Sequence, residues 1–200
     1  MKKFDEIELV KKVTLLSFYE QIAFATAACS RQSMAFASSN DDSEKLKMIL
    51  SSLSVLVTEK GIIETAKWQK ILETVMQLLP GEQVHSTIRD VLLEDAISSL
   101  AYAIRCVLRT SPQEAVRAAR RAYEATDQAA IKALNLAVGD SNFEEQISNH
   151  EFVQRELSRQ DRDMGLLVDG AVEPVIKRSQ IEELLTEQEL AFLDKFESVD

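Results

Sequence analysis

The chain has 200 residues, which is enough for one domain with a sizeable core and short for two. It contains only 5 Gly and 3 Pro, which disfavours any architecture of many short strands joined by tight turns. A net charge of −10 at pH 7 repels nucleic acid and anionic membranes, so we expect neither as a partner.

Helix-start signals recur along the whole chain. Five segments carry Ser or Thr followed three residues later by Glu, the spacing of a capping box: Ser17/Glu20, Ser111/Glu114, Ser141/Glu144, Ser179/Glu182 and Thr186/Glu189. The apolar pattern between them predicts helices over 4–15, 18–37, 42–60, 63–79, 87–109, 112–138, 142–147 and 150–168, with one or two more over 173–197. We therefore predict one all-α domain over residues 1–200, a bundle of about seven to nine helices.

The segment 18–37 is predicted to be the central helix, because Glu20 and Arg31 are its only charged residues. Cys29 lies within it and is expected to be buried and inert. A buried charge needs a counter-ion, and Asp95 opens another apolar stretch, over 95–104. We therefore predict that Arg31 and Asp95 are structural partners.

The helix predicted over 112–138 carries Arg117, Arg120 and Arg121 on one face and alanines on the opposite face. Glu114 and Glu124 are spaced to pair with these arginines, which favours a solvated, self-paired face. The alternative is a local basic patch for an acidic partner protein. Arg105 and Arg109 would join such a patch if the preceding helix folds back beside this one.

The sequence offers no convincing catalytic or metal-binding pattern. The two histidines, His85 and His150, have no second His or Cys at helical ligand spacing, and no nucleophile elbow occurs. We therefore expect no catalytic residue, cofactor or metal, and we favour a protein that is not an enzyme. The run "QRELSRQDRD" at 154–163 alternates in sign and is interpreted as a solvated face.

The C-terminal tail, residues 171–200, carries an apolar stripe that no later element can cover. Its members repeat at helical spacing, and they are Ile181, Leu184, Leu185, Leu190, Leu193 and Phe196. The stripe must pack on the domain's own core or on a second subunit. We favour the second subunit, as a homodimer, and take these residues as the candidate interface.

The chain resembles the YjaG-like family, bacterial helical proteins placed among domains of unknown function. The resemblance rests on "FATAACSR" at 24–31, "DAISSLAYAI" at 95–104, "SPQEAVRAARRA" at 111–122 and "EFVQRELSRQDRDMGLL" at 151–167. It covers roughly residues 10–170 and implies an all-helical domain in the cytoplasm, with no activity attached. The stretch after Arg31 and the tail beyond Gly170 depart from the family pattern.

Two functions remain open at this stage. The N-terminus lacks the apolar region of a signal peptide, no apolar run is long enough to span a membrane, and the two cysteines make no disulfide framework. These features favour a cytoplasmic protein that acts by binding another protein or its own copy. The alternative is an enzyme or small-ligand-binding protein with a polar pocket near Arg31 and Asp95.

Overall fold

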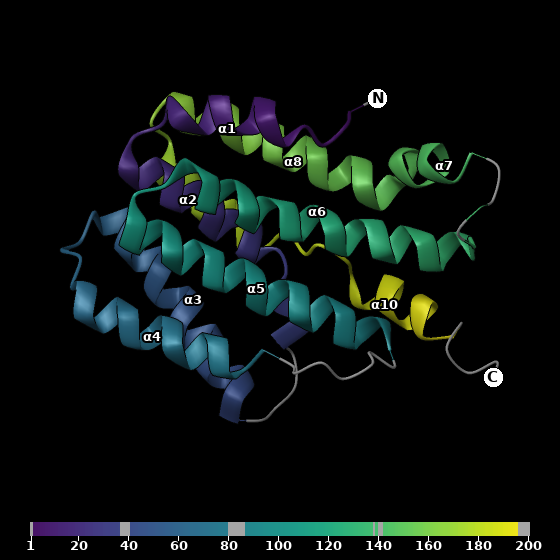
Figure 1. Cartoon of the computed structure of the whole chain (residues 1–200), viewed down its shortest axis with the longest axis horizontal. Coiled ribbons are helices and arrows are strands. Elements are labelled where there is room, and N and C mark those ends of the chain that lie inside the picture. The colour runs from purple at the N-terminus through teal and green to yellow at the C-terminus, as the bar shows by residue number, and fades with distance from the viewer. Residues whose placement is uncertain (1, 37–40, 80–86, 138, 140–141, 196–200) are drawn as a thin grey trace.

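The computed structural model describes residues 2–36, 41–79, 87–137, 139 and 142–195, and within them the fold is all-α (Figure 1). The elements are α1 (Glu6–Thr14), α2 (Phe18–Ser30), the 3-10 helix η1 (Ser33–Phe36), α3 (Asp41–Glu59), α4 (Thr65–Gln77), α5 (Ile88–Arg109), α6 (Pro112–Leu134), α7 (Phe143–Asn149), α8 (Glu151–Val168), α9 (Val172–Ser179) and α10 (Glu187–Asp194). The described residues contain no strand, so the predicted fold class is confirmed.

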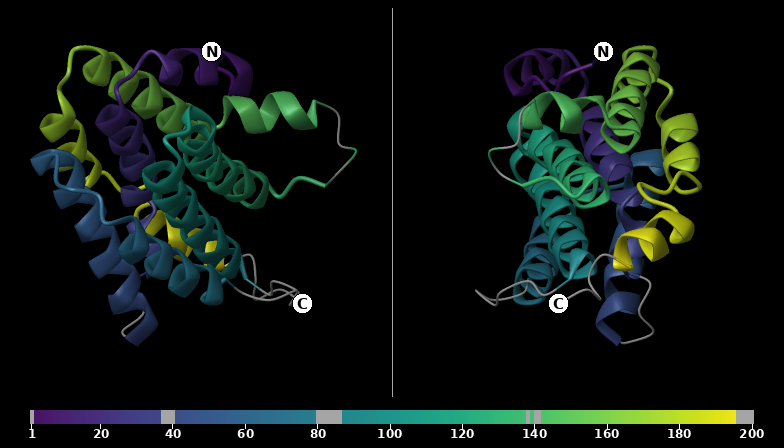
Figure 2. Two further views of the ribbon diagram at one scale, coloured as in Figure 1. Left: turned by 60° about the vertical axis from the view of Figure 1, so that its left-hand side comes forward. Right: turned by 90° about the vertical axis from the view of Figure 1, so that its right-hand side faces the viewer.

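Helix α2 is the centre of the bundle, as its composition predicts. Every residue from Gln21 to Ser30 is buried, and α3, α5, α6, α8 and α9 all contact the helix. In Figure 2, α9 lies across α2 from α5 and α6. The helices described here include none that is both long enough and apolar enough to cross a membrane.

One predicted helix is broken in the structure, and the predicted segment at the C-terminus contains two helices. The segment 18–37 ends as an α-helix at Ser30, turns at Arg31 and Gln32, and continues as η1. The segment 173–197, predicted as one or two helices, contains two, α9 and α10, joined by an irregular stretch. The described residues contain ten α-helices, one more than the upper end of the predicted seven to nine, because the tail forms two helices and not one.

The predicted capping boxes give a mixed result. Ser17/Glu20 and Thr186/Glu189 are confirmed at the starts of α2 and α10. Ser179 is instead the last residue of α9, so its prediction is wrong. At the start of α6, Ser111 makes no side-chain cap, and the Glu114 carboxylate pairs with arginines instead. The fifth box includes Ser141, which lies outside the described residues.

Helices α5 and α6 form a tight antiparallel pair on the face nearest the viewer in Figure 1. The turn between them uses Thr110 in the left-handed region, at φ 49°, and Pro112 at the first turn of α6. Small residues let the two backbones approach closely, and the Ser99 hydroxyl on α5 donates to the Ala118 carbonyl on α6 at 3.0 Å. Consequently Arg105 and Arg109 lie beside the arginines of α6.

Candidate functional site

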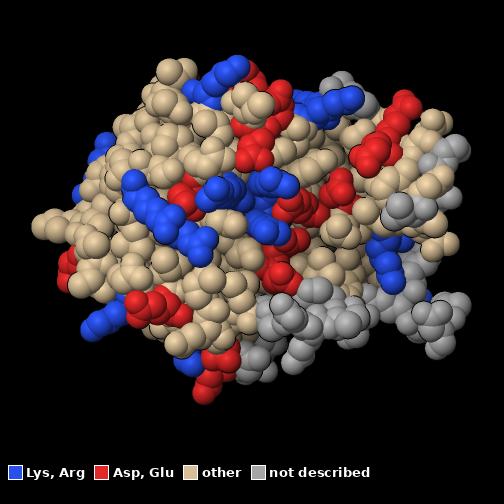
Figure 3. Space-filling model, viewed as in Figure 1, with Lys and Arg blue, Asp and Glu red and all other residues tan. Residues whose placement is uncertain are grey.

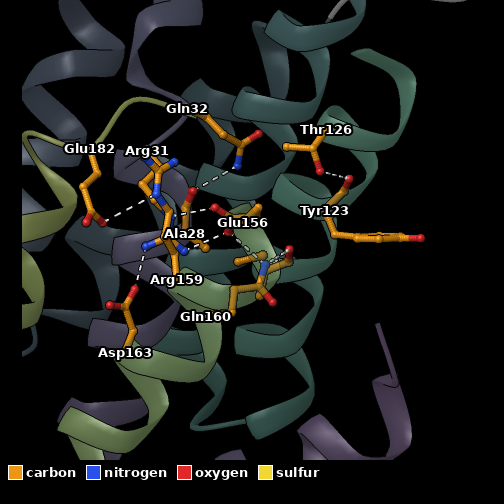
Figure 4. A network of polar contacts seen from close by, with 12 residues as sticks. Ala28, Arg31, Gln32, Tyr123, Thr126, Glu156, Arg159, Gln160, Asp163 and Glu182 are labelled. Carbon is orange, nitrogen blue, oxygen red and sulfur yellow. Dashed lines mark hydrogen bonds and ion pairs between the residues drawn. The ribbon is translucent and has the colours of Figure 1, made fainter. Parts of the chain in front are cut away.

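A fully buried ion-pair network lies where α2 ends against α8 (Figure 4). The guanidinium of Arg31 donates to both carboxylate oxygens of Glu156, at 2.9 and 2.8 Å. Its remaining terminal nitrogen, Nη1, donates to Asp163 at 2.6 Å. The paired, fork-like geometry to Glu156 is the strongest arrangement that an arginine and a carboxylate can make.

Burial makes the pairing of Arg31 obligatory. The Arg31 side chain is 1% exposed, and desolvation on its own lowers the pKa of the guanidinium. The charges and hydrogen bonds of Glu156 and then Asp163 outweigh desolvation and hold that pKa above its ordinary value. Gln160 completes the shell, because its Nε2 donates to Glu156 at 2.9 Å and to the Ala119 carbonyl at 3.0 Å.

Three partly buried arginines on α8, Arg155, Arg159 and Arg162, extend the network to α10 and the stretch before it. Arg162 bridges Asp163 at 3.0 Å and Glu182 at 2.6 Å. Arg155 pairs with Glu189 at 2.8 Å, and Arg159 donates to the Glu183 carbonyl at 2.8 Å. These contacts attach the C-terminal segment to the core.

Together with Arg31, these three arginines make four cations. They face four carboxylates: Glu156, Asp163, Glu182 and Glu189. The network is thus electrically neutral, so it offers no free charge to a ligand.

Two sequence-based predictions are wrong here. Arg31 does not pair with Asp95, because Asp95 faces α6 from α5 and bonds Arg121, whereas Arg31 faces α8. The run 154–163 is not simply a solvated face, because Glu156, Gln160 and Asp163 are all buried. These residues are spaced three or four apart, which puts them on the inner face of α8 beside its apolar residues.

Asp95 is buried as expected, but its partner is the Arg121 guanidinium, 3.2 Å away. Desolvation raises the pKa of this carboxyl to about 6, and the attraction of Arg121 only partly opposes the rise. The folded protein therefore holds the Asp95 proton more tightly than the unfolded chain does. The stability that this carboxyl contributes is greatest when it is protonated, and it falls as the pH rises from about 4 to about 6.

We expect Asp95→Asn to stabilise the protein at neutral and alkaline pH. The neutral amide avoids the desolvation of a carboxylate, and Arg121 keeps Glu124 as a partner at 3.0 Å. The free energy of unfolding in urea should rise by about 1–3 kcal/mol near pH 8, and the gain should shrink toward about pH 4. A variant that is less stable than the parent near pH 8 would show that the bond to Arg121 outweighs desolvation.

The apolar stripe of the tail packs mostly on the chain's own core. Leu184, Leu185, Leu190 and Leu193 are each 5% exposed or less and belong to the main hydrophobic cluster. Ile181 points to solvent at 81% exposure, and Phe196 lies outside the described residues. The stripe therefore gives no reason to invoke a second subunit, and the homodimer stays a prediction.

The residues first considered for chemistry do not assemble into a reactive group. Cys29 and Cys106 are buried free thiols that form no disulfide. Burial raises the pKa of each thiol to about 12. His150 caps α8, where its Nδ1 accepts from the Phe152 amide at 3.3 Å, while His85 lies outside the described residues. Across the described ranges, no cluster of three His, Cys, Asp or Glu could hold a metal ion.

A half-open cavity of about 420 Å³ lies beside the end of α2. It is bounded by Arg31 and Gln32, by η1, by the first turns of α5, and by the segment Leu184–Leu190. Asp95 does not line it, so only the Arg31 half of the predicted pocket is present. The side chain of Arg31 is already fully paired, which leaves Gln32 as the buried polar group of the cavity.

No family model and no curated protein matches the sequence. Among solved structures, the fold is similar to the crystal structure of a DUF416 family protein from Shewanella baltica OS155, with a TM-score of 0.71. The two chains are 14% identical, and the superposition covers 90% of this chain and 94% of the other. At this identity the likeness shows the fold, which is that of a bacterial domain of unknown function.

Proposed function

We propose that this protein acts by binding an acidic segment of another protein, without catalysis, at an arginine surface on α5 and α6. The arginine surface consists of Tyr102 and the arginines around it: Arg105, Arg109, Arg117, Arg120 and Arg121. Figure 3 shows basic side chains gathered in the middle of this face of the molecule. The observation that carries the proposal is that these arginines are exposed or partly exposed, while two of their carboxylate partners are buried beneath them.

On the arginine surface, the guanidinium groups are more exposed to solvent than the carboxylates that pair with them. Arg109 and Arg117 are 63% and 45% exposed, yet Glu114, which pairs with both, is only 4% exposed. Arg121 is 36% exposed, and its partner Asp95 is 9% exposed. Because these two carboxylates lie underneath, the outer layer is rich in guanidinium on a chain whose net charge is −10. The partners Glu6 and Glu124 are partly exposed beside Arg120.

Tyr102 gives the arginine surface an apolar centre. The guanidinium of Arg105 lies 5.2 Å from the ring centroid, and that of Arg117 lies 5.9 Å away. Arg105 makes no ion pair with any described residue, so its charge is available to a partner. Arginine and tyrosine are the side chains that most often dominate binding energy at protein interfaces.

The arginines of α6 pair within their own helix, as expected of a solvated face, but they remain open to a partner. The expected pairs Arg117–Glu114 and Arg120–Glu124 are confirmed, at 3.3 and 2.7 Å. They satisfy the arginines in the free protein but do not cover them. An acidic partner would add charge-assisted hydrogen bonds to guanidinium groups that already stand in place.

The test uses a fluorescent oligoglutamate peptide and Arg105→Glu/Arg117→Glu. We expect the parent protein to bind the peptide, and the double reversal to weaken binding at least about tenfold, since two favourable contacts become repulsive. Fluorescence anisotropy measures the affinity. Lys177→Glu/Arg178→Glu on α9 makes the same change of charge elsewhere and should leave binding nearly unchanged.

Two results would contradict the proposal. One is equal loss of binding in both double reversals, which would indicate a response to net charge alone. The other is tighter binding of a single-stranded DNA oligonucleotide than of the peptide at equal salt, which would assign the surface to nucleic acid. Sedimentation equilibrium of the full chain tests separately whether a second copy is the partner.

We also propose that the chain is related to the YjaG-like family and works in the cytoplasm. The support is that segments of the resemblance meet in space: "FATAACSR" supplies Arg31, and "EFVQRELSRQDRDMGLL" supplies Glu156 and Asp163. The similar fold of a DUF416 family protein agrees with a bacterial origin for this architecture.

A further inference from the structure

We infer that the outer side of α3 is a two-fold interface with a second copy of this chain. The α3 face is defined as the exposed side chains of α3 together with the groove beside its C-terminal half. Helix α3 packs on α2, α5, α9 and η1, and it runs along an edge of the bundle in the left view of Figure 2. The face is separate from the arginine surface and does not depend on the function proposed there.

The middle of α3 carries no charge, although one side of it meets solvent. The segment 48–58, "MILSSLSVLVT", contains no Asp, Glu, Lys or Arg, whereas 28% of the whole chain is charged. Leu53 and Val57 of this segment pack into the core. Met48 and Val55 lie on the opposite side, two helical turns apart, and are 69% and 48% exposed. A helix side that meets only water normally carries charged side chains, so this composition indicates a side that is covered.

Two hydroxyl groups of the α3 face are already bonded to the helix backbone. The Ser52 hydroxyl donates to the Met48 carbonyl at 2.9 Å, and the Thr58 hydroxyl donates to the Ser54 carbonyl at 2.9 Å. Covering these groups leaves their donors satisfied, which reduces the cost of removing them from water. Ser51 and Ser52 are also small, so a second helix can approach closely at that point.

A groove of about 320 Å³ lies between the C-terminal half of α3 and the start of α4. Val55 and Leu56 line it from α3, Ile62 lines it from the connecting stretch, and Trp68 lines it from α4. Met48 lies about 10 Å before Val55 along the helix axis, and its flexible thioether suits an irregular gap. A projecting side chain and a groove on one helix complement each other across a two-fold axis, because each copy then supplies both. The occupant that fits this face is therefore a second copy.

The charges at the two ends of α3 favour an antiparallel pair. Lys45 near the first end is 56% exposed, and Glu59 at the other end is exposed. A two-fold axis between positions 51 and 52 places Met48 of one copy beside Val55 of the other. The same axis brings Lys45 of each copy within reach of Glu59 of the other. A parallel pair would set Lys45 against Lys45 and Glu59 against Glu59, which is repulsive.

The neighbouring charges agree with this direction. Lys60 would lie toward the first turn of the second copy's α3, which is acidic. Lys45 keeps its bond to Asp42 at 2.9 Å and still has donors for Glu59, because an ammonium group offers three. The antiparallel arrangement therefore leaves no lysine facing a lysine across the axis.

Sedimentation equilibrium of the full chain measures the association. A single pair of helices makes a small interface, so we expect the average mass to rise from one chain toward two over about 10–500 µM. Met48→Glu/Val55→Glu places carboxylates in the contact and should weaken association at least about tenfold. Both side chains are exposed, so the variant should fold, and circular dichroism checks that it does.

Ile7→Glu/Ile181→Glu is the matched control. It makes the same change of charge at two exposed apolar side chains, which lie on α1 and in the tail, outside α3. We expect this variant to associate as the parent does.

Introduced cysteines test the direction of the pair. In the antiparallel arrangement, the thiols of Ser51→Cys lie beside the axis, whereas those of Thr58→Cys are about 20 Å apart along it. Oxidised glutathione should therefore cross-link Ser51→Cys and not Thr58→Cys, as seen by non-reducing electrophoresis. Cys29 and Cys106 do not compete, because both are buried.

Several results would overturn the inference. A parent chain that stays monomeric up to about 500 µM would mean that a second copy does not cover the face. Equal losses in the two double variants would indicate a response to net charge, and a loss confined to the control would assign the contact to α1 or the tail. Equal cross-linking of Ser51→Cys and Thr58→Cys would contradict the antiparallel pair, as would cross-linking of neither.

Discussion

Replacing Arg31 by alanine is expected to lower the free energy of unfolding by about 3–5 kcal/mol. The change leaves Glu156 and Asp163 buried without their shared cation, at 0% and 1% side-chain exposure. Either these carboxylates become protonated or water enters the bundle, and both processes cost stability. Equilibrium unfolding in urea, followed by circular dichroism, measures the loss.

The control for this experiment is Arg120→Ala. Arg120 also pairs with two carboxylates, Glu6 at 3.0 Å and Glu124 at 2.7 Å, but its side chain is 50% exposed. Exposed pairs contribute about 0–1 kcal/mol, so this variant should stay close to the parent. Similar losses for the two arginines would mean that burial does not set the strength of the Arg31 network.

A double-mutant cycle identifies the partner of Arg31. Arg31→Ala and Glu156→Ala should be strongly non-additive, because the two residues share hydrogen bonds. Arg31→Ala and Asp95→Ala should be additive within about 0.5 kcal/mol, since Asp95 bonds Arg121. Replacing Arg31, Glu156 and Asp163 together by Met and Leu should recover much of the stability, because no charge is then left buried.

The helices of this protein could be predicted because their signals are local. Caps such as Thr186/Glu189, the proline at the start of α6 and the 3.6-residue apolar pattern act within a few residues of the chain. The break after Ser30 was missed for the same reason. Apolar residues resume after Arg31 and Gln32, where the chain turns and the guanidinium reaches α8.

The Arg31 network could be predicted only in part. The sequence shows that a charge on the central helix needs a partner, but the choice of partner depends on which helices pack together. One signal was nevertheless present: Glu156, Gln160 and Asp163 occupy the same helical face as Val153, Leu157, Met164 and Leu167. Polar residues that recur on an apolar face indicate a buried network, and alternation of charge along 154–163 concealed this periodicity.

For the arginine surface, the sequence predicts the ion pairs within one helix but not the contacts between helices. Spacing along one helix correctly predicts the pairs within α6, yet it cannot show that Asp95 comes from α5 or that Tyr102 lies beneath two guanidinium groups. Those contacts arise because α5 and α6 pack antiparallel. Long-range packing thus converts a row of self-paired side chains into a surface with an outward positive layer.

The C-terminal segment is expected to be indispensable to the fold, so a chain that ends at Ser179 should not fold cooperatively. The truncation removes Leu184, Leu185, Leu190 and Leu193 from the main core, and burying each contributes about 1.5–3 kcal/mol. The combined loss is comparable to the about 5–15 kcal/mol that stabilises a typical domain. It also leaves Arg155 and Arg162 without Glu189 and Glu182.

Thermal unfolding followed by circular dichroism measures the effect, and two single substitutions in the full chain calibrate it. Leu193→Ala removes a side chain that is 0% exposed and should cost about 2–5 kcal/mol, whereas Ile181→Ala alters one that is 81% exposed and should cost less than about 0.5 kcal/mol. A truncated chain that melts cooperatively near the temperature of the full chain would show that α10 and the stretch before it only lie on a core that is complete without them. The segment would then be free to leave the bundle, and its leucines could serve as the intersubunit surface that the sequence predicts.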